Sequence, residues 1–289
     1  MSLQFDEERA LVYSEPFDIH AVNSSRAQVY RFVPENSRVL DVGCACGDLG
    51  YALVTHKKCE VWGIEGNEGS ANVARKLGVY KNIAVVDLNS VSTESFSNYN
   101  EKFDAIVFGD VLEHLSDPEN ILTIFKKYLR PGGYFVVSLP NISHLSIKAQ
   151  ILFDDWEYTD VGLLDRTHIR FFTYKTILAL LSKLNLQIDS LSYTVQGDNV
   201  LQGGKTFRKL PKCVRFFIYK NPYSFVFQYV MKLSPSSEGG FPERNKAHFR
   251  ITYATMPRDL RSAVRKSSFI LKYYFKILDL KEKFFCSKR

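Results

Sequence analysis

The feature that most constrains the fold of this chain is a glycine-bearing turn, which joins a short apolar run to an amphipathic stretch. The segment reads VLDVGCACG over residues 39–47. Gly43 and Gly47 allow positive backbone φ or the close approach of a ligand, which a Cβ atom would hinder. The spacing is neither the GxGxxG of dinucleotide-binding turns nor a phosphate loop. Pyrophosphate binding is therefore disfavoured, and the turn alone is equally typical of a tight βα connection.

Around this turn, apolar β-rich runs alternate with amphipathic stretches through the first 140 residues. This alternation is typical of βαβ units around a buried parallel sheet. Ser116 or Asp117 is a suitable cap for one of the helices, and Pro118 suits its first position. Strands are predicted at 38–42, 60–64, 83–87, 104–109, 134–138, 186–193 and 225–233, and helices at 49–56, 69–77, 118–129 and 174–184.

The alternation lapses over residues 141–172, directly after the fifth predicted strand. An insertion at this point of a doubly wound sheet lies at the carboxyl ends of the strands, where ligands bind. We therefore expect residues 141–172 to form a substrate-binding cap. The predicted domains are an α/β domain at 1–233, with this insertion, and a basic extension at 234–289.

Acidic residues follow successive predicted strands. Glu65-Gly66 ends the second, Asp87-Leu88 the third, and Asp110 follows the fourth, while Asp41 lies in the first. A carboxylate after the second strand can accept hydrogen bonds from both hydroxyls of a ribose. One after the third strand can accept a hydrogen bond from an adenine amino group, beside the Leu88 amide. Each acid alone is more typical of a helix cap, but their repetition predicts a nucleoside-containing cofactor.

Four motifs carry a resemblance to a known family: VLDVGCACGDLG (39–50), FGDVLEHLSDP (108–118), LRPGGYFVVSLPNISH (129–144) and GLLDRTHIRFFT (162–173). The chain resembles class I S-adenosylmethionine-dependent methyltransferases, and within them a bacterial group associated with glycosyltransferases in polysaccharide and cell-envelope biosynthesis. The resemblance implies a Rossmann-like, seven-stranded, mostly parallel sheet with an antiparallel last strand. Ala45 stands where the broader superfamily usually has glycine. The predicted cofactor residues are Asp41, Gly43, Cys44, Gly47, Glu65, Gly66, Asp87, Leu88 and Asp110.

Histidines gather in the segments expected around the methyl acceptor. His114, His144 and His168 are three of the six in the chain. A hydroxyl acceptor needs a general base or a metal, so these residues favour O-methylation. His114, His168 and Glu113 are the predicted catalytic residues.

Spacing raises a second possibility at the same place. Asp110, Glu113 and His114 stand at i, i+3 and i+4, and with His168 they would suit Mg²⁺ or another divalent cation. The resemblance extends to an acid-xx-Glu-His metal site with a distal His in some RNA ribose and ubiquinone methyltransferases, although Asp110 is shorter than the acid usual there. Metal-free catalysis and purely structural roles remain open alternatives.

Substrate contacts are expected from Arg166, Arg170, His144 and Trp156. The two guanidinium groups suit a carboxylate or phosphate, and Trp156 suits the face of a sugar. The alternatives are an ion pair of Arg166 with Asp165 and a small core around Trp156.

Charge is divided unevenly along the chain. Residues 1–200 have a net charge of −8, whereas residues 201–289 have +15. An amphipathic basic helix is predicted at about 257–285, which would either pack on the protein's own core or contact a membrane surface. The acidic N-terminus is unlike a signal peptide, and the five cysteines are odd in number and show no disulfide pattern. Both features indicate a cytoplasmic protein, and the basic end favours the inner membrane surface.

The function expected from these observations is O-methylation of a sugar or glycan-end group in a polysaccharide or lipid-linked precursor. The alternatives are a nucleic-acid ribose 2′-O-methyltransferase, ranked lower, and a non-catalytic S-adenosylmethionine-binding scaffold. Expected partners are therefore a small-molecule or glycan acceptor rather than nucleic acid.

Overall fold

The computed structural model describes residues 18–91, 102–196 and 204–236, which fall into two compact units. The first unit contains the described residues up to Pro140, together with 166–194 and 228–236. The second contains 141–165, 195–196 and 204–227. The predicted amphipathic helix at 257–285 and the rest of the basic extension beyond residue 236 lie outside the described residues.

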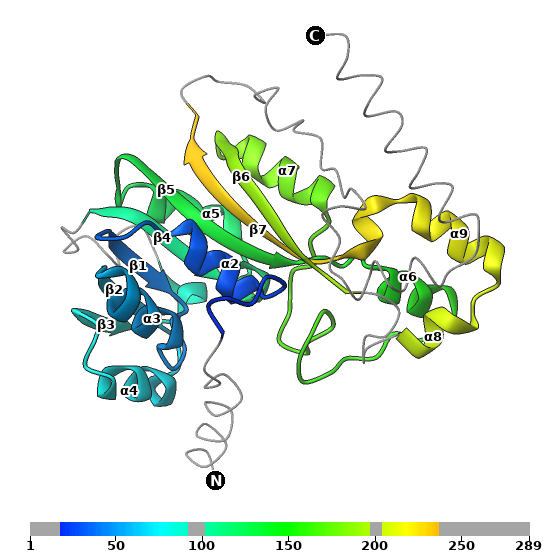
Figure 1. Cartoon of the computed structure of the whole chain (residues 1–289), viewed down its shortest axis with the longest axis horizontal. Coiled ribbons are helices and arrows are strands. Elements are labelled where there is room, and N and C mark those ends of the chain that lie inside the picture. Colours follow the sequence, from blue (N-terminus) through cyan, green and yellow to red (C-terminus); the bar gives the residue numbers. More distant parts are fainter. Residues whose placement is uncertain (1–17, 92–101, 197–203, 237–289) are drawn as a thin grey trace. The chain divides into compact units, whose positions relative to one another are not determined.

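A seven-stranded sheet forms the first unit, in the order β3-β2-β1-β4-β5-β7-β6 (Figure 1). β1 pairs in parallel with β2 and β4, β3 extends this pairing from β2, and β5 extends it from β4. β7 runs antiparallel to β5, so the predicted mixed sheet is confirmed. The strands are β1 (Arg38–Val42), β2 (Glu60–Glu65), β3 (Asn82–Val85), β4 (Phe103–Gly109), β5 (Leu129–Pro140), β6 (Leu186–Val195) and β7 (Val226–Pro235).

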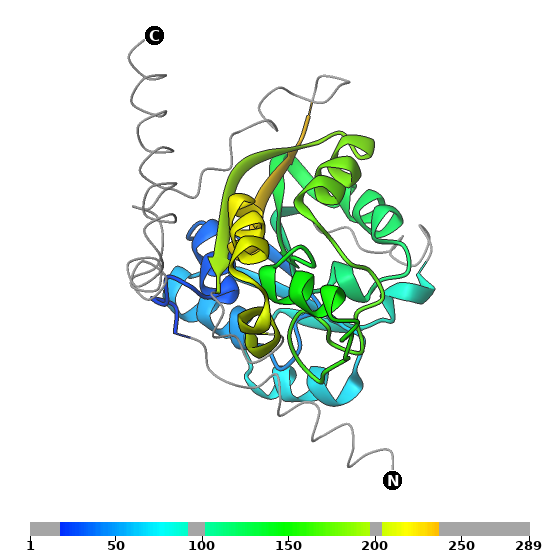
Figure 2. The same cartoon turned by 90° about the vertical axis from the view of Figure 1, so that its right-hand side faces the viewer.

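Helices cover both faces of this sheet (Figure 2). On one face, Val39 and Val107 belong to a buried cluster with Val29 of α2 and Leu53 of α3. On the other, Phe108 packs edge-on against Phe125 of α5, with ring centroids 5.5 Å apart. Strand side chains alternate between the faces, so each strand contributes to both layers. The helices are α2 (Ser25–Phe32), α3 (Asp48–Lys57), α4 (Glu68–Lys76), α5 (Pro118–Lys126) and α7 (Tyr174–Lys183).

The predicted helix at 118–129 starts as expected and ends early. Asp117 caps it by accepting the Asn120 amide at 3.0 Å, and Pro118 takes the first position. The helix ends at Lys126 because β5 already begins at Leu129. Phe103 lies opposite Leu129, and Ala105 lies opposite Tyr134, so the extra residues form a bulge that includes Gly132 at φ 79°. Glycine tolerates this conformation, which strands exclude for most residues.

The second unit is helical in its described part and differs in extent from the predicted insertion. It contains α6 (Leu145–Leu152), α8 (Gly204–Lys209), α9 (Lys212–Lys220) and the 3-10 turn η3 (Pro222–Phe225), and α6 contacts both α8 and α9. Within the α/β domain predicted at 1–233, residues 204–225 therefore belong to the second unit, and β7 follows them in the sheet. Periodicity did not reveal that 204–225 belongs with 141–165, because that grouping depends on contacts distant in sequence.

No helix in the described ranges is long and apolar enough to cross a membrane.

Tyr80 packs against the glycine-bearing turn and the start of α3. Its hydroxyl donates a hydrogen bond of 2.9 Å to Oδ2 of Asp41, which is only 3% exposed. A Cβ atom at Gly50, in the first turn of α3, would lie 2.2 Å from Cζ of Tyr80. Burial raises the pKa of Asp41 to about 7, against the opposing effect of the Tyr80 hydrogen bond. The start of α3 and the ionisation of Asp41 thus depend on the same tyrosine.

We expect Gly50→Ala to lower the free energy of unfolding by up to about 2 kcal/mol in urea titrations. The overpacking against Tyr80 costs about 1–3 kcal/mol, which exceeds the ~1 kcal/mol that alanine gains in a helix. Gly109→Ala is the matched control, because a Cβ there has no neighbour within 4 Å. Equal effects of the two substitutions would contradict the packing argument.

Asp41 also predicts a pH dependence of stability. Its folded-state pKa of about 7 lies above the ordinary aspartate value, so the folded chain binds more protons between about pH 4 and 7. This contribution to stability is present at low pH and is lost as the pH rises through 7. Asp41→Asn should therefore lose less stability than the wild type between pH 5 and 8 in urea titrations. Asp154→Asn, at an exposed position, should keep the wild-type slope; an unchanged slope in Asp41→Asn would refute the assignment.

Candidate active site

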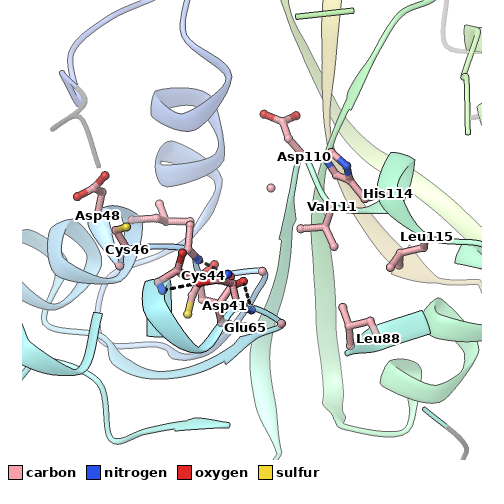
Figure 3. Close-up of a pocket in the computed structure, with 18 of the residues that line it drawn as sticks. Asp41, Cys44, Cys46, Asp48, Glu65, Leu88, Asp110, Val111, His114 and Leu115 are labelled. Carbon is pink, nitrogen blue, oxygen red and sulfur yellow. Dashed lines mark hydrogen bonds between the residues drawn. The ribbon is translucent and has the colours of Figure 1, made fainter. Parts of the chain in front are cut away.

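A cavity of about 550 Å³ opens in the first unit where β1, β2 and β4 end. In Figure 3, Asp41, Cys44 and Glu65 lie on one side of it, with Asp110 and His114 on the other. All nine residues predicted to bind a cofactor line this cavity: Asp41, Gly43, Cys44, Gly47, Glu65, Gly66, Asp87, Leu88 and Asp110. The structure thus brings the predicted set together, while the part each plays in binding stays a prediction.

The glycine-bearing turn has a left-handed backbone at three positions. Gly43 has φ 72°, Ala45 47° and Gly47 91°. The amides of Gly43 and Cys44 both donate to the Ile64 carbonyl, at 2.7 and 3.1 Å. A Cβ atom at Gly43 would stand 2.4 Å from Cγ2 of Val111, another residue of the cavity wall. Glycine is required there by both backbone conformation and packing.

Glu65 holds the two loops that flank the cavity. Its Oε2 accepts the Ala45 amide at 2.8 Å, and its Oε1 accepts the Asn67 amide at 2.9 Å (Figure 3). A carboxylate has about four acceptor positions, so lone pairs remain for hydroxyl donors from a ligand. This residue therefore shapes the turn and offers acceptors to the cavity.

Cys44 contributes little thiol chemistry to this site. Its sulfur packs in a small core with Ala71, Ala74 and Ile83. Burial raises the pKa of the Cys44 thiol far above its usual range, helped by the charges of Asp41 and Glu65. The thiol is therefore neutral, and the residue's part in the cavity wall is structural.

Asn89 is a cavity residue that the sequence analysis missed. Its side-chain oxygen accepts from both the amide (2.8 Å) and the hydroxyl (3.0 Å) of Ser116. Asp87 caps the 3-10 turn η1 (Leu88–Ser90) by accepting from the Asn89 amide and the Ser90 hydroxyl. An Asp followed two residues later by Asn is typical of a turn, so the Asp87–Asn89 spacing could have indicated this turn from the sequence.

Arg26 and Asp48 were also missed. Both line the cavity, and a guanidinium nitrogen of Arg26 lies 3.7 Å from Oδ2 of Asp48. Arg26 comes from α2, which was not predicted as a helix. The cavity therefore contains a cation that no strand-end pattern indicates.

Asp110 adopts a left-handed conformation at the end of β4. It has φ 56°, its amide donates to Oγ of Ser138 at 2.9 Å, and that hydroxyl donates back to Oδ1 at 2.7 Å. Burial raises the pKa of Asp110, although hydrogen bonds from Ser138 and Gln228 and the nearby histidines oppose this. Ser138 thus fixes a carboxyl group at the cavity wall.

His114 is held by the segment that follows residue 166. Its Nδ1 lies 3.1 Å from the Thr167 carbonyl. Because a carbonyl only accepts, Nδ1 must carry the proton, and in the neutral ring Nε2 then has a lone pair. The amides of Ile169 and Arg170 donate to the Glu113 carbonyl at 3.0 and 2.9 Å. These main-chain bonds fix the 3-10 turn η2 (Leu112–His114), and with it the histidine on the cavity wall.

Glu113 and His168 lie behind this wall. Oε1 of Glu113 lies 3.9 Å from Nε2 of His168, and their side chains are 1% and 8% exposed. The His168 ring packs edge-on against His114 with centroids 4.8 Å apart. Ligand atoms of Glu113, His114 and His168 lie within 4.8 Å of one another, but Asp110 is not part of this group. Three of the four predicted metal ligands are therefore brought together.

The predicted substrate residues diverge. His144 is fully buried in the second unit, where it caps α6; its Nδ1 lies 2.9 Å from Oγ of Ser146 and its Nε2 3.0 Å from the Gln196 carbonyl. Burial lowers the pKa of His144 to about 4. The expectation that His144 contacts an acceptor is therefore wrong, because both ring nitrogens serve the fold. In the sequence, a histidine that caps a helix and a histidine that contacts a ligand look the same.

The other three are exposed. Trp156 is 41% exposed and packs edge-on against Tyr158 at 6.2 Å. The guanidinium of Arg170 donates to the Ser116 carbonyl, so this residue supports the loop after η2. Arg166 lies on the surface of the first unit. Their contacts with a substrate remain predictions.

Solved structures share this fold. A SAM-dependent methyltransferase from Thermotoga maritima, described as a possible histamine N-methyltransferase, has a TM-score of 0.51 and 17% identity, covering 80% of this chain and 98% of its own. A magnesium protoporphyrin IX methyltransferase from Synechocystis PCC 6803 with bound SAH has a TM-score of 0.52 and 14% identity, covering 81% and 95%. At these identities the likeness is one of fold.

Curated relatives named ubiquinone biosynthesis O-methyltransferase match part of the chain. The protein from Cereibacter sphaeroides (strain ATCC 17023) is 30% identical over 122 residues, 42% of this chain and 49% of the relative. The one from Dinoroseobacter shibae is 31% identical over 152 residues, 52% and 60% respectively. The match thus spans about half the length of these relatives.

The family described as "Methyltransferase domain" matches residues 19–191, which include the glycine-bearing turn, Glu65 and the η2 segment. This range is more than half of the chain, and it contains most of the cavity just described. The chain therefore belongs to the methyltransferase domain family.

Proposed function

We propose that this methyltransferase acts on a hydroxyl group, with Nε2 of His114 as the general base. The observation that carries the proposal is the contact between Nδ1 of His114 and the Thr167 carbonyl, which leaves a lone pair on Nε2 of a cavity residue. Hydroxyl acceptors need such a base, whereas many amine and carbon acceptors do not. The partial likeness to O-methyltransferases supports the same reaction class.

The residues of the cavity fit S-adenosylmethionine. Glu65 retains acceptor positions for ribose hydroxyls, and Asp87 and Leu88 line the same cavity for the adenine. Arg26 offers a cation for the carboxylate of the methionine part. When bound, the cofactor supplies a methyl group activated by a sulfonium.

His114 would move the acceptor's proton. Its Nε2 would accept the proton of the acceptor hydroxyl, and the Thr167 carbonyl would stabilise the imidazolium that forms. Glu113 and His168 act as positioning residues, because they pack behind His114 and fix the ring's orientation.

The same three residues are a partial fit to a divalent cation. They provide one imidazole of His114, one of His168 and the Glu113 carboxylate. Asp110 is engaged by Ser138 instead. These three residues would hold Mg²⁺, which would supply a Lewis acid for a hydroxyl acceptor, whereas base catalysis needs only His114.

For the acceptor, we propose a sugar or glycan-end hydroxyl. Each unit by itself offers groups of the kind that sugars bind. The second unit has the exposed aromatic rings of Trp156 and Tyr158, and the first has the exposed cation of Arg166. An anionic membrane surface beneath the basic chain end beyond residue 236 remains part of this proposal.

Glu65→Ala should weaken S-adenosylmethionine binding by about 10- to 100-fold in calorimetry, because a charged acceptor of the ribose hydroxyls is lost. Glu68→Ala is the matched control, since that exposed carboxylate on α4 pairs with Arg75. Thermal unfolding of both variants checks that the turn remains folded. Wild-type affinity in a folded Glu65→Ala protein would remove Glu65 from the site.

His114→Ala should retain cofactor binding and reduce turnover about 10²- to 10⁴-fold, which is the usual contribution of a general base. The readout is release of S-adenosylhomocysteine with an acceptor that the wild type methylates. His56→Ala, on the exposed side of α3, should leave the rate unchanged.

Chelation separates the two chemistries of the His114 cluster. If His114 acts as the base without a metal, EDTA leaves wild-type turnover intact. A rate that falls in EDTA and returns with Mg²⁺ would overturn base catalysis by His114 and assign the cluster to a metal.

A further inference from the structure

The second unit has an aromatic and cationic surface on α9 that methyl transfer does not explain. Phe217 is 68% exposed, which is the largest exposed fraction of the aromatic residues among the exposed large apolar side chains of the described ranges. Cys213 and Lys220 are also exposed, and with Phe217 they stand at i, i+4 and i+7, on one face of the helix. Nζ of Lys220 lies 4.7 Å from the ring centroid of Phe216 and 5.7 Å from that of Phe217.

The other side of the same segment is anchored in the unit. Phe207 is fully buried, Leu210 is 5% exposed and Ile218 is 9% exposed. α6 contacts both α8 and α9. The helix therefore has its apolar packing on one side, and Phe217 is not needed to complete it.

Charge on α8 and α9 has one sign. Residues 204–220 contain six Lys and Arg residues and no Asp or Glu. Arg208, Lys209, Lys212 and Lys220 are exposed. A cationic surface with a protruding aromatic ring complements an anionic lipid surface, in which phosphates bind the cations and the ring enters the boundary between headgroups and acyl chains.

Other exposed apolar residues of this unit fit such a surface less well. Seven of the twelve exposed large apolar side chains among the described residues belong to the second unit. Those at 156–161 alternate with acids, and Asp154, Asp155, Glu157 and Asp160 are all exposed. Anionic lipid would repel these carboxylates, whereas α9 has none.

We propose that α9 is a peripheral docking surface for anionic phospholipid. The helix lies in the plane of the interface with Phe217 directed into it, and Lys212, Lys220 and their neighbours bind the phosphates. A single ring and a few cations give weak, reversible association. The surface would concentrate the enzyme at a bilayer independently of the chemistry at His114.

Cys213 provides a direct test, because its exposed thiol lies one helical turn from Phe217, whereas Cys44, Cys46 and Cys59 are buried. A full-length Cys286→Ser protein is labelled at Cys213 with an environment-sensitive fluorophore. Vesicles of phosphatidylcholine with one quarter phosphatidylglycerol should shift its emission to the blue and protect it from an aqueous quencher, and pure phosphatidylcholine should do neither.

Two matched pairs of variants accompany the label. Phe217→Ser should reduce vesicle partitioning about three- to tenfold, and Tyr51→Ser, at a 47% exposed aromatic of the first unit, should not. Lys212→Glu with Lys220→Glu should reduce it at least about tenfold. Lys76→Glu with Lys175→Glu, at exposed positions of the first unit, makes the same change in net charge and should have a much smaller effect.

Three results would overturn the proposal. The first is a protein that does not float with anionic vesicles. The second is a protein that floats while the Cys213 label stays open to the quencher, which would place binding elsewhere in the chain. The third is a label that responds to duplex RNA and not to vesicles, which would assign α9 to nucleic acid.

Discussion

The shape of the cavity depends on the two hydrogen bonds that the Glu65 carboxylate accepts from the main chain. Its two oxygens accept the amides of Ala45 and Asn67, so one side chain at the end of β2 fixes the turn after β1 and the start of α4. The left-handed turn can be held this way because Gly43 has no Cβ to collide with Val111. Under the turn, Tyr80 supports Asp41 through a hydrogen bond. The shape of the cavity wall therefore depends on contacts between these side chains and the main chain of the turn.

The opposite wall is organised by main-chain bonds between distant segments. The Glu113 carbonyl accepts two amides, and the Thr167 carbonyl fixes the His114 ring. These bonds link a turn after β4 to a segment more than fifty residues later. With Nδ1 of His114 held by the Thr167 carbonyl, Nε2 is the ring nitrogen left for the proposed general base. Glu113 and His168 support the ring from behind, so acidic and basic groups near the site serve orientation as well as charge.

Much of the fold could be predicted because its signals are local. The strand and helix periods, the Asp117 and Pro118 helix start, and the acids at strand ends each depend on a few neighbouring residues. His144 shows where such reasoning fails, since a histidine before a helix has the same pattern whether it caps that helix or faces a ligand. Arg26 and Asn89 were missed because neither belongs to a strand-end motif, and their places on the cavity wall come from packing.

The sequence by itself determined the mixed sheet, the glycine-bearing turn and the strand-end residues of the cavity, because strand order and strand ends bring those residues to one edge. Tertiary structure decided which of the three clustered histidine candidates reaches the cavity wall. His114 does so through the Thr167 carbonyl, His168 packs behind it, and His144 is buried in the second unit. Burial and hydrogen-bond partners are properties of the folded chain, so no spacing rule can assign them.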